Sequence, residues 1–323
     1  MLTRALSVAA LALAAAAPAV QAQTATAYPE KAVRIIVPFG PGNSYDHTTR
    51  FIADHLHGQT GQSFVVEPKQ GAVGNIAAAY VARAPADGYT LLLAANSTHS
   101  ANQHLFKELN FDPVADFAPV STLVQVPQAL IVSPTLDVDS VDELIEVVRK
   151  RPGELNYGSS SATGRVAVES FLDRAGLKGQ HIGYKTTTQA VVDLASGQLH
   201  FMFTDASTGI TQAKSGKVKV LAVTSGERLD AAPDLPTMTE AGLPGYEFVA
   251  WLALVAPAGT PPEVVQRLSE LVNQAVGDPA TREFLANLYI QPYPGTPDSL
   301  RELIASDTKR WGDMIRAAGI EPQ

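Results

Sequence analysis

Apolar and polar residues follow two different periods along most of this chain. Short apolar runs typical of strands are followed by segments in which apolar residues recur at helical spacing. Up to residue 132 this pattern predicts strands at 33–37, 63–67, 89–94, 118–126 and 129–132, with helices at 46–57 and 74–84.

A second block of the same kind follows. The pattern predicts strands at 155–158, 181–184, 199–203 and 218–223, separated by helices at 140–150, 164–175 and 188–195. After a Pro-rich passage it predicts a strand at 248–255 and long helices at 261–276 and 297–318. Strands that alternate with helices are typical of α/β folds with a largely parallel sheet.

The first 22 residues have the pattern of a secretory signal peptide. Arg4 precedes an apolar run at 6–17, and Val20-Gln21-Ala22 is an A-x-A-like cleavage site. The run is too short to span a bilayer, and no second apolar segment of spanning length follows, which disfavours a membrane anchor. We therefore expect a chain exported to the periplasm and cleaved near Ala22.

Charge and composition exclude several classes of function. The chain has 24 basic and 32 acidic residues, a net charge of −8 that becomes −9 once Arg4 is removed with the signal peptide. This net negative charge argues against nucleic acid and anionic lipid as partners. The absence of cysteine excludes thiol catalysis and Cys-ligated metals. The seven histidines show no metal-ligand spacing, so we expect no metal and no cofactor.

Two α/β blocks, with the chain returning to the first, predict two lobes with a cleft between them. The first domain would contain residues 28–127 and 248–323, and the second would contain 128–247. Ligands of open α/β sheets bind beyond the carboxyl ends of the strands. This rule selects four loops, at 39–46, 96–99, 159–165 and 204–207.

The first loop precedes a helix and is rich in glycine. We expect Ser44 to cap that helix and the amides at the helix start to favour an anion; an ordinary turn without a ligand is the alternative. A dinucleotide fingerprint is disfavoured because Tyr45 occupies the third glycine position. The candidate ligand residues of the first loop and of the loop at 96–99 are Phe39, Gly40, Pro41, Gly42, Asn43, Ser44, Asp46, Ser97 and Thr98.

The other two loops are rich in hydroxyl groups, which can donate to a carboxylate. Arg165 could add a bidentate contact or remain a solvated residue of the first helical turn. Asp205 could accept a hydrogen bond from a ligand or cap the helix that starts near residue 208. The candidates of these two loops are Ser159, Ser160, Ser161, Ala162, Thr163, Arg165, Thr204, Asp205 and Ser207.

Longer motifs resemble one family over essentially the whole mature chain. The chain is similar to the Bug (TctC-like) family, the periplasmic substrate-binding proteins of tripartite tricarboxylate transporters. The motifs include Val37-Pro38-Phe39, Asp87-Gly88-Tyr89-Thr90-Leu91, Tyr157-Gly158-Ser159-Ser160, Leu221-Ala222-Val223-Thr224-Ser225 and Ala256-Pro257-Ala258-Gly259-Thr260-Pro261.

The resemblance implies a two-lobed periplasmic binding protein of type II, a Venus-flytrap with its ligand in the cleft. It implies a monomer that binds a small carboxylate, either a di- or tricarboxylate or an aromatic carboxylate, and needs no cofactor. The partners would be membrane permease subunits, with a sensor ectodomain as an alternative. The chain departs from the family pattern at Asn43, at Val73 and at Arg165, where the family has glycine, glycine and histidine.

Two classes of function remain to be compared. The first is a solute-binding protein for a small carboxylate. The second is an exported serine hydrolase, because Gly158-x-Ser160-x-Ala162 is similar to a nucleophile elbow. The hydrolase needs a base within hydrogen-bond reach of Ser160, and no spacing in the sequence shows one.

Overall fold

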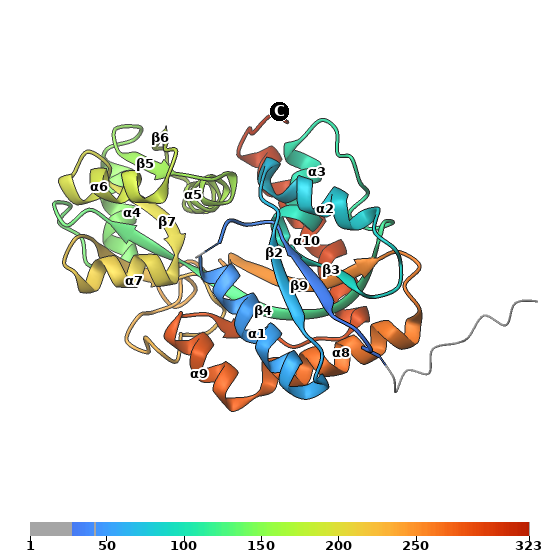
Figure 1. The fold of residues 1–323 in the computed structure, drawn as a ribbon. Coiled ribbons are helices and arrows are strands. Elements are labelled where there is room, and N and C mark those ends of the chain that lie inside the picture. Colours follow the sequence, from blue (N-terminus) through green and yellow to red (C-terminus); the bar gives the residue numbers. More distant parts are fainter. Residues whose placement is uncertain (1–27, 42, 323) are drawn as a thin grey trace, which may run out of the picture.

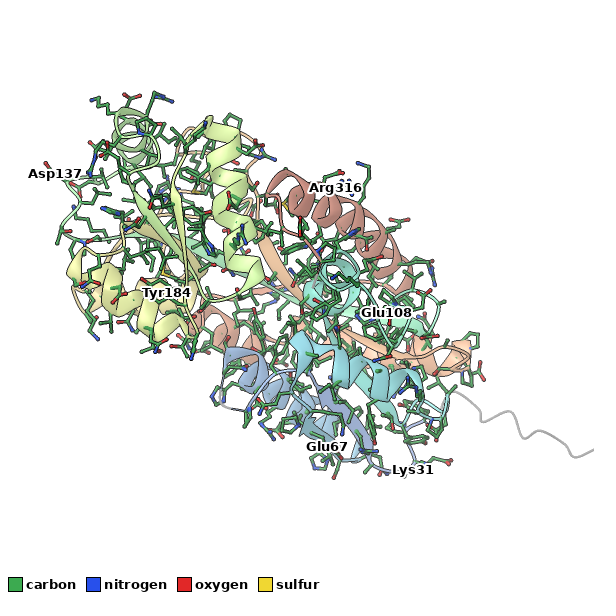
Figure 2. The ribbon with its side chains drawn as sticks, turned by 90° about the horizontal axis from the view of Figure 1, so that it is seen from above. Lys31, Glu67, Glu108, Asp137, Tyr184 and Arg316 are labelled. Carbon is green, nitrogen blue, oxygen red and sulfur yellow. The ribbon has the colours of Figure 1, made fainter. Side chains whose placement is uncertain are left out.

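The computed structural model describes residues 28–41 and 43–322, so the signal peptide predicted at 1–22 lies outside the described residues. Figure 1 shows two lobes, each with a sheet and covering helices, which the long strand β4 (Phe117–Val132) connects. In Figure 2, Asp137 lies at the outer end of one lobe and Lys31 at the far end of the other.

The first lobe is built on the sheet order β2-β1-β3-β9-β4. Strand β1 pairs in parallel with β2 and β3, whereas β9 runs antiparallel to β3 and β4. Its strands are β1 (Val33–Val37), β2 (Phe64–Pro68), β3 (Thr90–Ala95), β9 (Val249–Pro257) and the short β10 (Gln291–Pro292). Its helices are α1 (Ser44–Thr60), η2 (Ala72–Gly74), α2 (Asn75–Ala82), η3 (Ser97–Ala101), α3 (Asn102–Leu105), α8 (Pro262–Gly277), α9 (Pro279–Asn287) and α10 (Pro297–Ala317).

The second lobe repeats the parallel βα arrangement. Strand β5 pairs in parallel with β6 and β7, while β7 and β8 run antiparallel to β4. Its strands are β5 (Asn156–Ser159), β6 (Gln180–Gly183), β7 (Phe201–Asp205) and β8 (Lys219–Val223). Its helices are α4 (Val141–Lys150), α5 (Ala162–Ala175), α6 (Thr187–Ser196) and α7 (Ala206–Lys214).

Strand β4 belongs to both lobes. It pairs with β9 as far as Pro127 and with β7 from Gln128 onward. The two extended segments predicted from the sequence are therefore one continuous strand. Proline has no N–H to donate and is tolerated only where a ladder bond is dispensable. Pro127 meets this condition because it lies where the strand changes partners.

The C-terminal helix α10 contacts the cores of both lobes. Leu300 and Ile304 pack in the core that contains Trp251 of β9, whereas Trp311 and Ile315 pack with apolar residues of the second lobe. The helix is also tied to β9 by a buried hydrogen bond in which Trp251 Nε1 donates to Asp307 Oδ2 at 2.8 Å. A change in the angle between the lobes must therefore be accommodated along α10 as well as in β4.

Within the described part of the chain, no helix combines the length and apolar character that crossing a membrane requires.

Candidate ligand-binding site

A cavity of about 250 Å³ lies between the lobes, beyond the carboxyl ends of β1, β3, β5 and β7. Both lobes contribute to its wall. The lining residues are Phe39, Tyr45, Val73, Ala95, Asn96, Ser97, Gln128, Ser160, Ser161, Thr163, Gly164, Thr187, Phe203, Thr204, Asp205, Ala250 and Leu252.

Four α-helices begin at this cavity. Tyr45 is in the first turn of α1, Thr163 in that of α5 and Thr187 in that of α6, while Asp205 immediately precedes α7. A helix N-terminus has unpaired amides and a partial positive charge, and both favour an anion. Lys, Arg and His are absent from the described lining residues, so no cationic side chain of the lining adds to the partial positive charge of these helix starts.

The first helix is capped by Asn43, not by Ser44 as the sequence predicts. Asn43 Oδ1 accepts hydrogen bonds from the amides of Tyr45 and Asp46, both at 2.9 Å, and Asn43 Nδ2 donates to the carbonyl of Gly40. Ser44 is instead the first helical residue. An amide side chain can satisfy the helix amides and the loop carbonyl at the same time, which a serine hydroxyl cannot do at both places.

Each serine of the β5–α5 loop has its own partner. Ser159 is buried, and its Oγ lies 2.7 Å from His181 Nε2. Ser160 Oγ lies 2.8 Å from Thr187 Oγ1. Ser161 caps α5, since its Oγ accepts from the amide of Gly164 at 3.1 Å. Because a neutral hydroxyl group is no general base, the contact of Ser160 with Thr187 does not activate Ser160 as a nucleophile.

Arg165 lies one turn into α5, beside Glu169. Its Nε is 3.6 Å from Glu169 Oε1, and the side chain is 34% exposed. It also lies close enough to His181 that its charge, after burial as the larger cause, lowers the pKa of that imidazole. The structure thus directs Arg165 toward Glu169, and Arg165 is not among the lining residues.

Asp205 combines the two roles that the sequence left open. Its Oδ1 accepts from the amide of Thr208 at 2.9 Å, so it caps α7, which begins at Ala206. It also lines the cavity, where Tyr45 of the other lobe is near. Burial, and secondarily the charge of Asp205, raise the pKa of the Tyr45 hydroxyl.

Some of the residues expected from the sequence to bind a ligand line the cavity and others do not. Phe39, Ser97, Ser160, Ser161, Thr163, Thr204 and Asp205 line it. Gly42 and the side chain of Ala162 lie outside the described part of the chain. The candidates that are not among the lining residues are Gly40, Pro41, Asn43, Ser44, Asp46, Thr98, Ser159, Arg165 and Ser207.

These outer residues mostly support the loops. Asp46 is buried and forms an ion pair with Arg50 at 3.0 Å along α1. Thr98 Oγ1 accepts from the amide of Ala95 at 3.1 Å, which ties the loop after β3 back to its strand. Ser207 lies in the first turn of α7, partly buried.

Sequence reasoning missed several lining residues. Thr187 follows β6, so the rule that selected the other loops would have found it had it been applied to this strand. Gln128 lies within β4 and carries no such signal. The selected loops also contain Tyr45, Asn96 and Gly164, which were not named as candidate residues. The further lining residues outside these loops are Val73, Ala95, Phe203, Ala250 and Leu252.

Other parts of the described chain also contain cavities. A larger cavity of about 750 Å³ lies within the first lobe, among Phe117, Val265 and Ile304, away from the loops between the lobes. The described residues contain no group of three or more His, Asp or Glu side chains that could hold a metal ion.

The two sheets, the strand that connects them and the cavity between the lobes define a two-lobed α/β binding protein. Comparison with known proteins identifies the family. Residues 48–320 match the family described as "Tripartite tricarboxylate transporter family receptor", TctC. Protein BugT of Bordetella pertussis is 34% identical over 299 residues, which is 92% of each chain.

Solved structures also support the assignment to this family. The structure of R. palustris Rpa4515 with adipate superimposes with a TM-score of 0.81 at 36% identity, covering 92% of this chain and all of the other. MatC (Rpa3494) from Rhodopseudomonas palustris with bound malate gives a TM-score of 0.74 at 29% identity, covering 89% of this chain and all of the other. The chain therefore belongs to the TctC family of solute-binding proteins.

Proposed function

We propose that this protein is a periplasmic solute-binding protein that captures a small carboxylate between its lobes and delivers it to a tripartite tricarboxylate-type membrane transporter. The observation that carries the proposal is the convergence of four helix starts on one cavity whose described lining contains no cationic side chain. Such a site can bind an anion through the partial positive charge of the helix starts and the hydroxyl groups of its lining, which are already in place, so little ordering cost remains on binding.

Two buried donors on the first lobe support the proposal. Asn96 Nδ2 and Ser97 Oγ have no hydrogen-bond partner among the described residues, although both residues line the cavity. Buried polar groups are almost always paired in native proteins. A carboxylate held by the serine loop and Thr163 on one side could accept from Asn96 and Ser97 on the other, which would close the lobes upon the ligand.

We assign the first domain to residues 28–127 and 248–323 and the second to 128–247, with the hinge in β4. The change of strand partners between Pro127 and Gln128 supports the first boundary. We further propose that residues 1–22 direct export and are cleaved near Ala22. Sequencing the N-terminus of the protein recovered from a periplasmic fraction tests this assignment.

Isothermal titration of the purified mature protein tests the binding function. The panel should contain succinate, adipate, malate and benzoate, after denaturation and refolding to remove any bound solute. We expect micromolar or tighter binding of at least one carboxylate and none of the corresponding primary amides. Equal binding of acids and amides, or turnover of a generic ester that is lost in Ser160→Ala, would contradict the proposal.

A further inference from the structure

Val73 has a backbone conformation that its side chain disfavours. Four consecutive residues have positive φ: Gly71 at 133°, Ala72 at 45°, Val73 at 53° and Gly74 at 93°. The left-handed region is routine for glycine but a genuine outlier for a β-branched residue. Strain of this kind persists only where the surroundings impose it, and it is concentrated at functional sites.

Buried contacts fix the backbone at Val73. The side-chain amide of Asn102, which is fully buried, donates to the carbonyl of Val73 at 3.0 Å. The amide of Gly74 donates to the carbonyl of Gly71 at 2.9 Å. A Cβ at Gly74 would stand only 2.6 Å from Thr98 Cγ2, so the chain packs closely there. The direction of the Val73 side chain is therefore set by its surroundings rather than by its own preference.

Val73 lines the cavity and is 52% exposed. Ser161, Thr163 and Thr187 give the second lobe a polar wall of hydroxyl groups. The first lobe presents the polar residues Asn96 and Ser97 but also an aromatic pair, Phe39 and Tyr45, which pack edge to face with ring centroids 4.7 Å apart. In the structure, half of the strained apolar side chain has no apolar cover.

We propose that Val73 is a selectivity residue whose isopropyl group packs against the hydrocarbon part of the bound carboxylate. The inference rests on the proposed function and narrows its ligand class. The carboxylate lies at the helix starts and hydroxyl groups, while an aliphatic or aromatic segment lies along Val73, Phe39 and Tyr45. Acids with such a segment bind in preference to compact or heavily hydroxylated acids, because the segment covers apolar surface that water otherwise contacts.

Two substitutions separate the shape, polarity and strain of Val73. Val73→Thr keeps the branched shape and the disfavoured backbone preference but places a hydroxyl group in the apolar wall. Val73→Gly removes both the side chain and the strain. Val192→Ala is the control, because Val192 is 62% exposed on α6 and does not line the cavity.

The measurement is the Kd of adipate and of succinate for each purified mature protein by isothermal titration, together with the melting temperature. We expect the wild type to prefer adipate, and both Val73 variants to lose at least fivefold in adipate affinity with succinate changed less than twofold. The melting temperature of Val73→Gly should be unchanged or higher, and Val192→Ala should match the wild type in affinity.

Three results would overturn the inference while leaving the proposed function intact. Adipate affinity within twofold of wild type in both variants would leave Val73 without a role in selectivity. Equal losses for adipate and succinate would assign Val73 to closure of the lobes instead. A clearly lower melting temperature of Val73→Gly would contradict the claim that the backbone of Val73 is strained in the folded protein. If the wild type bound no carboxylate of any kind, the proposed function itself would fail, and the inference with it.

Discussion

Tyr45 of the first lobe and Asp205 of the second line the same cavity, and the carboxylate of Asp205 contributes to the raised pKa of the Tyr45 hydroxyl. This proximity places a negative charge in a cavity proposed to bind anions. Because the same carboxylate caps α7, its charge and its structural role can be separated by a single substitution.

Asp205→Asn should therefore strengthen the binding of a dicarboxylate. Asn and Asp are equally good N-caps, so α7 should remain stable while a like charge is removed. At the effective dielectric constant near a protein surface, the gain is about 1 kcal/mol, or roughly fivefold in Kd for adipate. Titration at low and high salt measures it, and the gain should shrink at high salt.

Asp173→Asn is the control for net charge, since Asp173 is exposed on α5 and does not line the cavity. It should leave the adipate Kd within about twofold. Weaker adipate binding by Asp205→Asn would show that Asp205 accepts a hydrogen bond on the ligand side, which is the role that hydroxy or amino acids would require.

Asn43→Ala should destabilise the fold through the loss of the α1 cap. The amides of Tyr45 and Asp46 would lose their acceptor, at a cost of about 1 kcal/mol in the free energy of unfolding. Chemical denaturation measures this loss. Asn43→Asp should lose less stability than the alanine variant, because Asp still accepts both amide bonds although it cannot donate to the carbonyl of Gly40. A loss as large as that of the alanine variant would argue against the cap.

Arg165→Ala should change the affinity for a carboxylate by less than twofold. Arg165 is directed toward Glu169 and does not line the cavity. Thr163→Val is the comparison, because it replaces a lining hydroxyl group with a methyl group and should cost about 1 kcal/mol, roughly fivefold in Kd. A tenfold loss in Arg165→Ala would mean that the guanidinium group turns toward the ligand.

The order of strands and helices was largely predictable because local patterning and tertiary packing agree in both lobes. The division of β4 into two segments was wrong, since a proline in a strand normally interrupts pairing, and nothing local in the sequence shows that the strand changes partners at Pro127. Helix α9 was not predicted. It follows α8 almost directly, with Asp278 as its cap and a proline as its first residue.

The candidate site was predicted at the level of loops better than at the level of side chains. The carboxyl ends of strands converge for topological reasons, so the rule found the loops that contain Phe39, Ser160 and Asp205. Which side chains turn inward depends on hydrogen bonds made after folding. Asn43 turns back to its own loop and Ser159 turns to His181, a residue 22 positions away. The spacing of residues along a single sequence does not show which side chains will form such hydrogen bonds.

His99 should make the folded state sensitive to acid. Its side chain is fully buried beside Phe117, with ring centroids 4.8 Å apart, and burial lowers its pKa to about 3. An unfolded histidine titrates near pH 6.5, so below that pH the unfolded state binds a proton that the folded state excludes. The free energy of unfolding is therefore not reduced by His99 above about pH 6.5. It falls as the pH decreases from about 6.5 toward 3, by about 1.4 kcal/mol per pH unit.

The free energy of unfolding should therefore fall by about 2 kcal/mol between pH 6.5 and pH 5 on account of His99 alone. Urea denaturation at pH 7, 6 and 5 measures the slope. Because glutamine does not titrate, His99→Gln should remove the part of this pH dependence that comes from the uptake of one proton on unfolding, about 1.4 kcal/mol per pH unit. This holds whatever the substitution does to the free energy of unfolding at pH 7. Equal slopes in wild type and His99→Gln would show that the imidazole is solvated or protonated in the folded state.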